Sequence, residues 1–116
     1  MRDYCRKLRQ EQTSFDVTLA TADGEQVKAH RVILSAGSSF FDNIFSNAFH
    51  PNTYVCMKGI KKAVLENIID FLYNGETNII QEELATFLET AEELTVKGLQ
   101  YNLDTKAKSN SQTVYH

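Results

Sequence analysis

The sequence predicts a single α+β domain in which short strands are interleaved with a majority of helices. In residues 17–20 apolar side chains alternate along the chain, and residues 53–57 are rich in β-branched and aromatic types, as is typical of strands. Residues 39–49, 61–73 and 81–94 place apolar side chains at i, i+3 and i+4, the spacing of helix faces that pack on a core. A chain of 116 residues buries roughly two-thirds of its unfolded surface, so these elements share one core.

Composition and charge exclude several classes of protein. The hydrophobic share of 42% and the charged share of 23% are those of a globular domain, which excludes disorder throughout. A net charge of -3 argues against non-specific binding of nucleic acid through the whole surface. Cys5 and Cys56 are too few for a disulfide framework or a zinc site, which favours a reducing intracellular location. No apolar run approaches the length of a membrane span, and the charged N-terminus does not resemble a signal peptide.

The N-terminal segment, residues 1–12, is predicted to be a helix with a narrow apolar stripe made of Tyr4, Cys5 and Leu8. Isolated helices of about a dozen residues are marginal in water, so this one must dock on its own core or on a second copy. The basic residues around the stripe indicate a solvated face rather than a DNA-binding surface, and they are Arg2, Arg6, Lys7 and Arg9.

The stretch from Phe15 to Phe49 organises the rest of the chain. Strands at 17–20 and 26–29 are expected to form a hairpin through the Asp23-Gly24 turn. Two helices follow, and Ser39 with Asp42 resembles a capping box at the start of the second helix. Their apolar stripes are Val32, Ile33 and Ala36 on the first helix, and Phe40, Phe41, Ile44, Phe45, Ala48 and Phe49 on the second.

The second half of the chain continues the alternation. A strand at 53–57 precedes a helix at 61–73, which is apolar nearly all round and is therefore expected in the middle of the domain, ending at Asn74-Gly75. Residues 76–80 predict a short strand or turn, and a further amphipathic helix begins at Gln81.

The end of the chain is expected to be less ordered. Leu99 is expected to begin a last helical turn. Residues 102–116 shift to polar types with little to bury, which predicts a flexible tail or linker after the domain.

The search for chemistry predicts no catalytic, cofactor-binding or metal site. His30, His50 and His116 occur in no motif with a carboxylate and a nucleophile, and the glycines are isolated, so no phosphate-binding loop is indicated. The spacing of cysteines and histidines matches no compact metal site. A binding module that uses no cofactor is therefore favoured over an enzyme.

Asp16 and Arg31 are charged residues in apolar surroundings, where an unpaired charge is costly. They either pair with each other, or Asp16 caps a strand while Arg31 points to water. His30 is interpreted as a helix-start residue rather than a ligand or a pH switch.

The segments FDVTL (15–19), VKAHRVILSA (27–36), SFF (39–41) and DFLYNGE (70–76) resemble, in this order, the signature of the BTB/POZ domain. Leu84 to Leu99 resembles the closing helices of that family, so the resemblance covers residues 4–101 and leaves 102–116 as the tail. It implies helical hairpins flanked by a small mixed sheet.

The resemblance also implies a two-fold homodimer. In BTB domains an acidic and a basic residue at the positions of Asp16 and Arg31 form a charged pocket at the dimer interface. The implied interface contains Tyr4, Cys5, Leu8, Phe15, Val32 and Ile33.

The function that the resemblance implies is self-association of a transcription or chromatin regulator in the nucleus, as in similar invertebrate BTB domains. The expected partners of the domain are a second copy of itself and other BTB domains or corepressors. No direct contact of this domain with nucleic acid or with a membrane is expected. The extra N-terminal strand of many such regulators has no room before Tyr4.

Two alternatives come from other BTB groups. A potassium-channel type of tetramerising domain is not supported, because the AHRVILSA motif belongs to the other groups. A cytoplasmic substrate receptor of a cullin-based ubiquitin ligase is the second alternative. Its cullin-facing positions read Phe49, His50 and Pro51 here, without the usual Glu, and Pro51 would end the helix early. The chain also stops soon after Leu99, before the helices that enlarge the cullin contact, so cullin binding is disfavoured.

Overall fold

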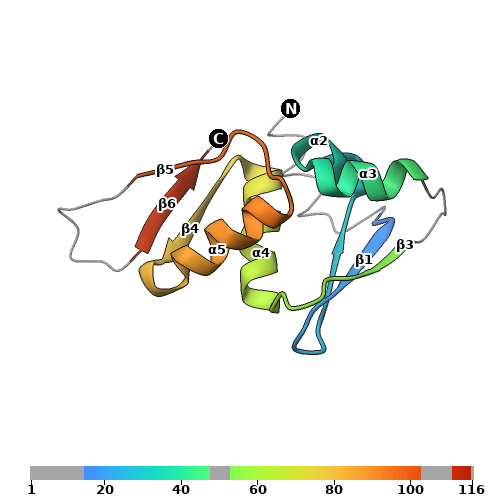
Figure 1. Ribbon diagram of the computed structural model, residues 1–116, viewed down its shortest axis with the longest axis horizontal. Coiled ribbons are helices and arrows are strands. Elements are labelled where there is room, and N and C mark those ends of the chain that lie inside the picture. The colour runs from blue at the N-terminus through green and yellow to red at the C-terminus, as the bar shows by residue number, and fades with distance from the viewer. Residues whose placement is uncertain (1–14, 48–52, 103–110, 116) are drawn as a thin grey trace.

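The computed structural model describes residues 15–47, 53–102 and 111–115. The elements in chain order are β1 (Val17–Ala20), β2 (Gln26–Ala29), α2 (Arg31–Gly37), α3 (Ser39–Asn47), β3 (Thr53–Cys56), α4 (Lys62–Asn74), β4 (Glu76–Ile80), α5 (Gln81–Glu93), β5 (Gln100–Asn102) and β6 (Ser111–Tyr115). Helices α4 and α5 occupy the centre, with one small sheet on either side (Figure 1). The predicted α+β class is confirmed, whereas the helix predicted within residues 1–12 lies outside the described residues.

The first sheet has the strand order β2-β1-β3 and is mixed. Strand β1 runs antiparallel to β2 and parallel to β3, so that Leu19 lies opposite both Val27 and Val55. Leu19 is fully buried, because the alternation of β1 points it into the core. The predicted hairpin turn is present, and Gly24 there has a φ of 81°, which glycine adopts at no steric cost.

Helices α2 and α3 form a hairpin whose turn is closed by Ser38. The Ser38 hydroxyl accepts the backbone N–H of Phe41 at 3.2 Å and also donates to the carbonyl oxygen of Leu94. The capping box predicted at Ser39 and Asp42 is therefore placed one residue too late. The cause is the extended backbone of Ser38, with φ -142° and ψ 121°, which is the conformation that an N-cap residue needs.

Helix α4 is the centre of the core, as its nearly all-round apolar pattern predicted. It contacts α2, α5, β2 and β4. It ends where expected, because Gly75 takes a left-handed φ of 80° and donates its N–H to the carbonyl of Phe71 at 2.8 Å. Its buried residues are Val64, Leu65, Ile68, Ile69, Phe71 and Tyr73.

The segment at 76–80 is a strand, with Thr77 and Ile79 of β4 buried and the alternate residues exposed. Helix α5 follows it directly and buries Leu84, Phe87, Thr90 and Ala91. The last helical turn expected at Leu99 is absent, since Gly98 turns the chain with a φ of 68° and the chain continues into strand β5.

The second sheet has the order β4-β6-β5, with both pairs antiparallel. Within the predicted flexible tail, residues 111–115 instead form strand β6, and residue 102 ends β5. The sequence of this segment does contain a short strand signal, since Thr113, Val114 and Tyr115 are β-branched or aromatic, but the polar composition of residues 102–116 outweighed it in the prediction. Its ladder depends on backbone groups, which every residue supplies. Residues 103–110 and 116 lie outside the described part of the chain.

Candidate functional site

The start of helix α2 is held by Asp16, which lies just before β1. The Asp16 carboxylate oxygen Oδ1 accepts the backbone N–H of Arg31 at 2.8 Å. His30, the residue in the N-cap position of α2, makes no side-chain capping bond itself. An acidic side chain from the residue before β1 therefore supplies the cap, and its charge also suits the positive end of the helix.

The guanidinium group of Arg31 lies over α3 rather than against Asp16. Its Cζ is 5.3 Å from the centroid of the Phe45 ring, and Nη2 donates to the carbonyl oxygen of Phe45 at 3.2 Å. This cation lies near the C-terminal turn of α3, where the helix dipole favours positive charge. The structure thus brings Asp16 and Arg31 together through the backbone of residue 31. The charged pocket that the resemblance implies at a dimer interface stays a prediction.

His30 is buried, with 4% of its surface exposed, and the Tyr73 hydroxyl holds it. The hydroxyl oxygen accepts the backbone N–H of His30 at 2.8 Å and lies 2.7 Å from Nδ1 of the imidazole. Phe15 packs its ring 4.7 Å from the imidazole. His30 therefore starts the helix, as interpreted, and joins β2 to α4.

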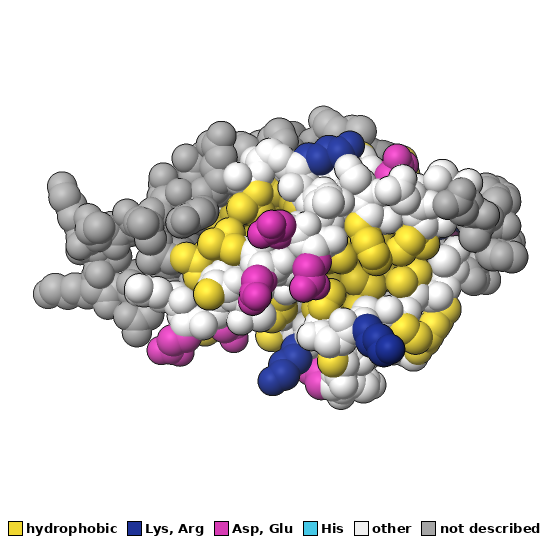
Figure 2. Space-filling view, in the orientation of Figure 1, with side chains coloured by type: hydrophobic (Ala, Val, Ile, Leu, Met, Phe, Trp, Pro, Cys, Tyr) yellow, Lys and Arg dark blue, Asp and Glu magenta, His cyan; other side chains and the backbone are white. Residues whose placement is uncertain are grey.

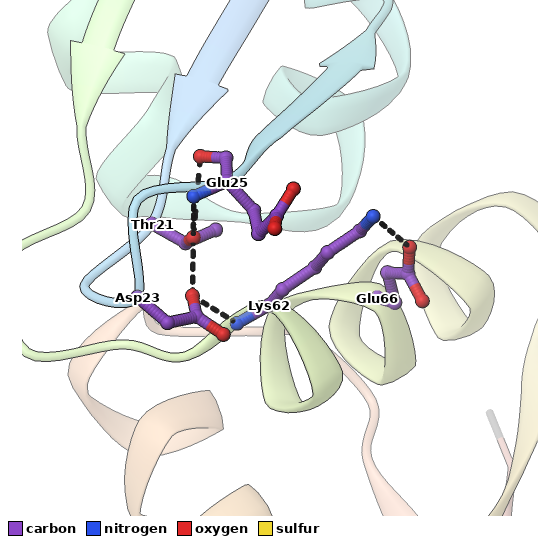
Figure 3. A network of polar contacts seen from close by, with 5 residues as sticks. All are labelled: Thr21, Asp23, Glu25, Lys62 and Glu66. Atoms are coloured by element: carbon purple, nitrogen blue, oxygen red, sulfur yellow. Dashed lines mark hydrogen bonds and ion pairs between the residues drawn. The ribbon is translucent and has the colours of Figure 1, made fainter.

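A second remote cap lies at the other end of β1 (Figure 3). Oδ1 of Asp23 accepts the backbone N–H of Lys62 at 3.1 Å, at the start of α4, and also accepts the Thr21 hydroxyl. The N–H of Glu25 in turn donates to Thr21 Oγ1 at 3.0 Å. The hydrogen bond from Thr21 is the main cause that holds the pKa of Asp23 below its ordinary value of 3.8. The Lys62 N–H acts in the same direction, and partial desolvation opposes both.

The predicted interface residues have different surroundings in the structure. Val32 is 67% exposed on α2, whereas Ile33 is only 6% exposed and belongs to the chain's own core. Phe15 is half-buried against His30. The other residues singled out from the sequence lie outside the described part of the chain, and they are Tyr4, Cys5, Leu8, Phe49, His50 and Pro51.

Two further exposed apolar residues were not singled out from the sequence. Tyr54 is 58% exposed on the edge strand β3, and Ile80 is 50% exposed where β4 meets α5. Strand alternation is the signal that finds Tyr54, because its neighbours Thr53 and Val55 face inward and are half-buried. Figure 2 shows acidic side chains over α5 and, beside them, hydrophobic side chains over the region of β1 and β3.

No metal-binding cluster is found among the described residues: no group of three His, Cys, Asp or Glu side chains there is placed to hold an ion. Cys56 is an exposed free thiol. Of the helices in the described ranges, none has the length and apolar character needed to span a membrane.

The family model for the BTB/POZ domain matches residues 5–111 of this chain. The chain belongs to the BTB/POZ family. Among curated relatives, the sex determination protein fruitless of Drosophila melanogaster is 42% identical over 103 residues, 89% of this chain and 11% of fruitless. The longitudinals lacking protein-like of the same fly is 40% identical over 94 residues, 81% of this chain and 73% of the relative. Protein tramtrack, alpha isoform, also from this fly, is 39% identical over 76% of this chain and 11% of tramtrack.

The BTB domain of zebrafish PATZ1 has a similar structure, with a TM-score of 0.70 over 83% of this chain and 80% of that one. Its identity of 23% supports the fold alone. The predicted membership of the BTB/POZ family, with similarity to invertebrate members, is confirmed. BTB/POZ domains are protein-interaction modules, so the role of this BTB/POZ domain is to bind protein.

Proposed function

We propose that this BTB/POZ domain mediates homodimerisation of a nuclear transcription or chromatin regulator, with the exposed side of α2 in the dimer interface. The observation that carries the proposal is Val32, whose aliphatic side chain is 67% exposed within the AHRVILSA motif. Its helical neighbours Ile33 and Leu34 are buried in the core. An exposed valine gains free energy when a second apolar surface covers it.

Helix α2 is held firmly enough to serve as an interface. Asp16 caps its start and Arg31 ties it to α3, while Ile33 and Leu34 anchor its inner face. A surface that is ordered before association loses less conformational entropy when it binds. We infer that Asp16 and Arg31 contribute to dimerisation by fixing α2 and by lying near the interface as a charged pocket.

The nuclear, regulatory part of the proposal is supported by the Drosophila relatives, one of which is named a sex determination protein. This chain spans only 11% of that relative's length, so the activity of any whole protein that contains the domain is part of the proposal. Other BTB domains or corepressors are proposed as further partners. The cullin-receptor alternative stays disfavoured on the sequence of Phe49, His50 and Pro51.

Analytical ultracentrifugation tests the proposal. The unmodified chain is expected to be a dimer at about micromolar concentration, and Val32→Glu is expected to shift it toward monomer. Glu suits the first turn of a helix, so the variant should keep its fold, which circular dichroism checks. Tyr54→Glu, which places the same charge on exposed strand β3, is the matched control and should remain dimeric. A stable monomer for the unmodified chain would overturn the proposal.

A further inference from the structure

The segment that follows α5, residues 94–97, is bound to the turn between α2 and α3. The N–H of Lys97 donates to the carbonyl oxygen of Gly37, the last residue of α2, at 2.9 Å. The Ser38 hydroxyl donates to the carbonyl oxygen of Leu94, which lies 56 residues further along the chain. The C-terminal end of α2 is therefore fixed by a distant part of the chain.

Thr95 makes two further hydrogen bonds of this contact. Its carbonyl oxygen accepts the N–H of Ser39 at 3.3 Å, and its hydroxyl oxygen Oγ1 accepts the N–H of Phe40 at 2.9 Å. Both N–H groups lie in the first turn of α3, where the helix itself offers no acceptor. Thr95 thus supplies partners to the start of α3 from outside the helical hairpin.

The backbone of Thr95 is strained. Its φ is 46°, and among the residues that the structure describes it is the only one besides glycines with a positive φ. A β-branched residue is unfavourable in this left-handed region, which glycine adopts at no steric cost. The side chain of Thr95 is exposed, so burial in the core does not explain a threonine here. The hydrogen bond from Phe40 to the hydroxyl is what threonine provides and glycine does not.

We propose that Thr95 is a positioning residue for the interaction surface of α2. Its hydroxyl fixes the turn between α2 and α3, and the turn fixes the end of the seven-residue helix on which Val32 is exposed. Asp16 holds the first turn of the same helix, so the two contacts together set its orientation. This inference rests on the proposed function, because it takes the exposed side of α2 as the dimer interface.

Three substitutions at position 95 of the full chain separate positioning from a contribution to stability. Thr95→Ser keeps the hydroxyl. Thr95→Val removes the hydroxyl and keeps both the shape of the side chain and the backbone strain. Thr95→Gly removes the hydroxyl and the strain together, so the unfolding temperature of this variant should stay close to that of the unmodified chain.

Amide hydrogen exchange, followed by NMR, reports on the turn itself. The Phe40 amide should exchange about three- to tenfold faster in Thr95→Val and in Thr95→Gly than in the unmodified chain, because its acceptor is lost. The exchange rate should be unchanged in Thr95→Ser. An unchanged rate in Thr95→Val would overturn the proposal, and so would an equal increase in Thr95→Ser and Thr95→Val.

Sedimentation measures whether the effect reaches the α2 surface. The dissociation constant of the dimer should rise about three- to tenfold in Thr95→Val and in Thr95→Gly, and should be unchanged in Thr95→Ser. A role in stability alone predicts instead that Thr95→Gly, which keeps its unfolding temperature, dimerises like the unmodified chain. That result would overturn the proposal even if the Phe40 amide exchanged faster.

The two measurements also separate a failure of this inference from a failure of the proposed function. If the unmodified chain is a monomer, the proposed function is wrong, and exchange of the amides in the last turn of α2 decides whether Thr95 positions that helix. Faster exchange of these amides in both Thr95→Val and Thr95→Gly would support the positioning role. Exchange rates equal to those of the unmodified chain would overturn it.

Discussion

Asp23 and Lys62 are 39 residues apart in the sequence, and the carboxylate of the first caps the helix that begins at the second. Asp16 does the same for α2 through the backbone N–H of Arg31. The residues in the N-cap positions of these helices, His30 and Lys61, make no side-chain capping bond. The two ends of β1 therefore fix the starts of α2 and α4, which sets the position of both helices against the first sheet.

Asp16→Ala is expected to destabilise the domain by about 1 kcal/mol, the usual cost of losing a helix cap. Arg31→Gln should cost a separate amount, because it removes the guanidinium contact with Phe45 and keeps the backbone N–H. The two effects should add in the double variant, as measured by urea unfolding. Strong rescue in the double variant would show instead that the two side chains act as a charge pair.

Asp23 makes stability depend on pH in the acid range. Its pKa is lowered on folding from an ordinary 3.8, so its ionised form stabilises the folded state above that value. This contribution is lost as pH falls through the lower pKa of the folded state. The difference in unfolding free energy between the unmodified chain and Asp23→Asn should be constant above about pH 5 and shrink below pH 4. A constant difference across the acid range would contradict the capping role of the charge.

Gly37→Ala is expected to change the stability of the domain by less than about 1 kcal/mol, because a small steric cost opposes a small gain in helix propensity. An added Cβ would lie 2.5 Å from Cδ2 of Leu72, which is the end of a flexible, half-buried side chain, so the leucine side chain must move at small cost. The gain in helix propensity from alanine is up to about 1 kcal/mol. In a Leu72→Ala background the same change should be neutral or stabilising. Thermal unfolding of the unmodified chain, Gly37→Ala, Leu72→Ala and the double variant separates the steric cost from the gain in helix propensity.

Tyr73→Phe is expected to lower the unfolding free energy by about 1–3 kcal/mol, because the buried His30 loses a partner for both its backbone N–H and its Nδ1. Tyr54→Phe, the same change at a hydroxyl on an exposed ring, should have little effect. Urea unfolding measures both variants. An equal loss of unfolding free energy in Tyr73→Phe and Tyr54→Phe would contradict a stabilising role of the Tyr73 hydroxyl.

The main elements of the fold could be predicted because their signals are local. The alternation around Leu19 and the all-round apolar pattern of α4 depend on residues a few positions apart, as does the stop at Gly75. Motif order was equally informative, since the segments from Phe15 to Glu76 identify the family without any geometry. Among the described site residues, the sequence singled out Asp16, Arg31 and Val32, which all lie before or within α2.

Only the tertiary structure decided how residues far apart in the sequence are arranged. The sequence predicted both Val32 and Ile33 as interface residues, yet packing buries Ile33 and leaves Val32 exposed. It predicted a flexible tail where β6 pairs with β4, because the polar composition of residues 102–116 outweighed the short run of strand-forming residues at 113–115. Local patterns report which face of an element is apolar. Which distant carboxylate reaches a helix start, or which strand fills a gap, depends on how the whole chain closes its loops around the core.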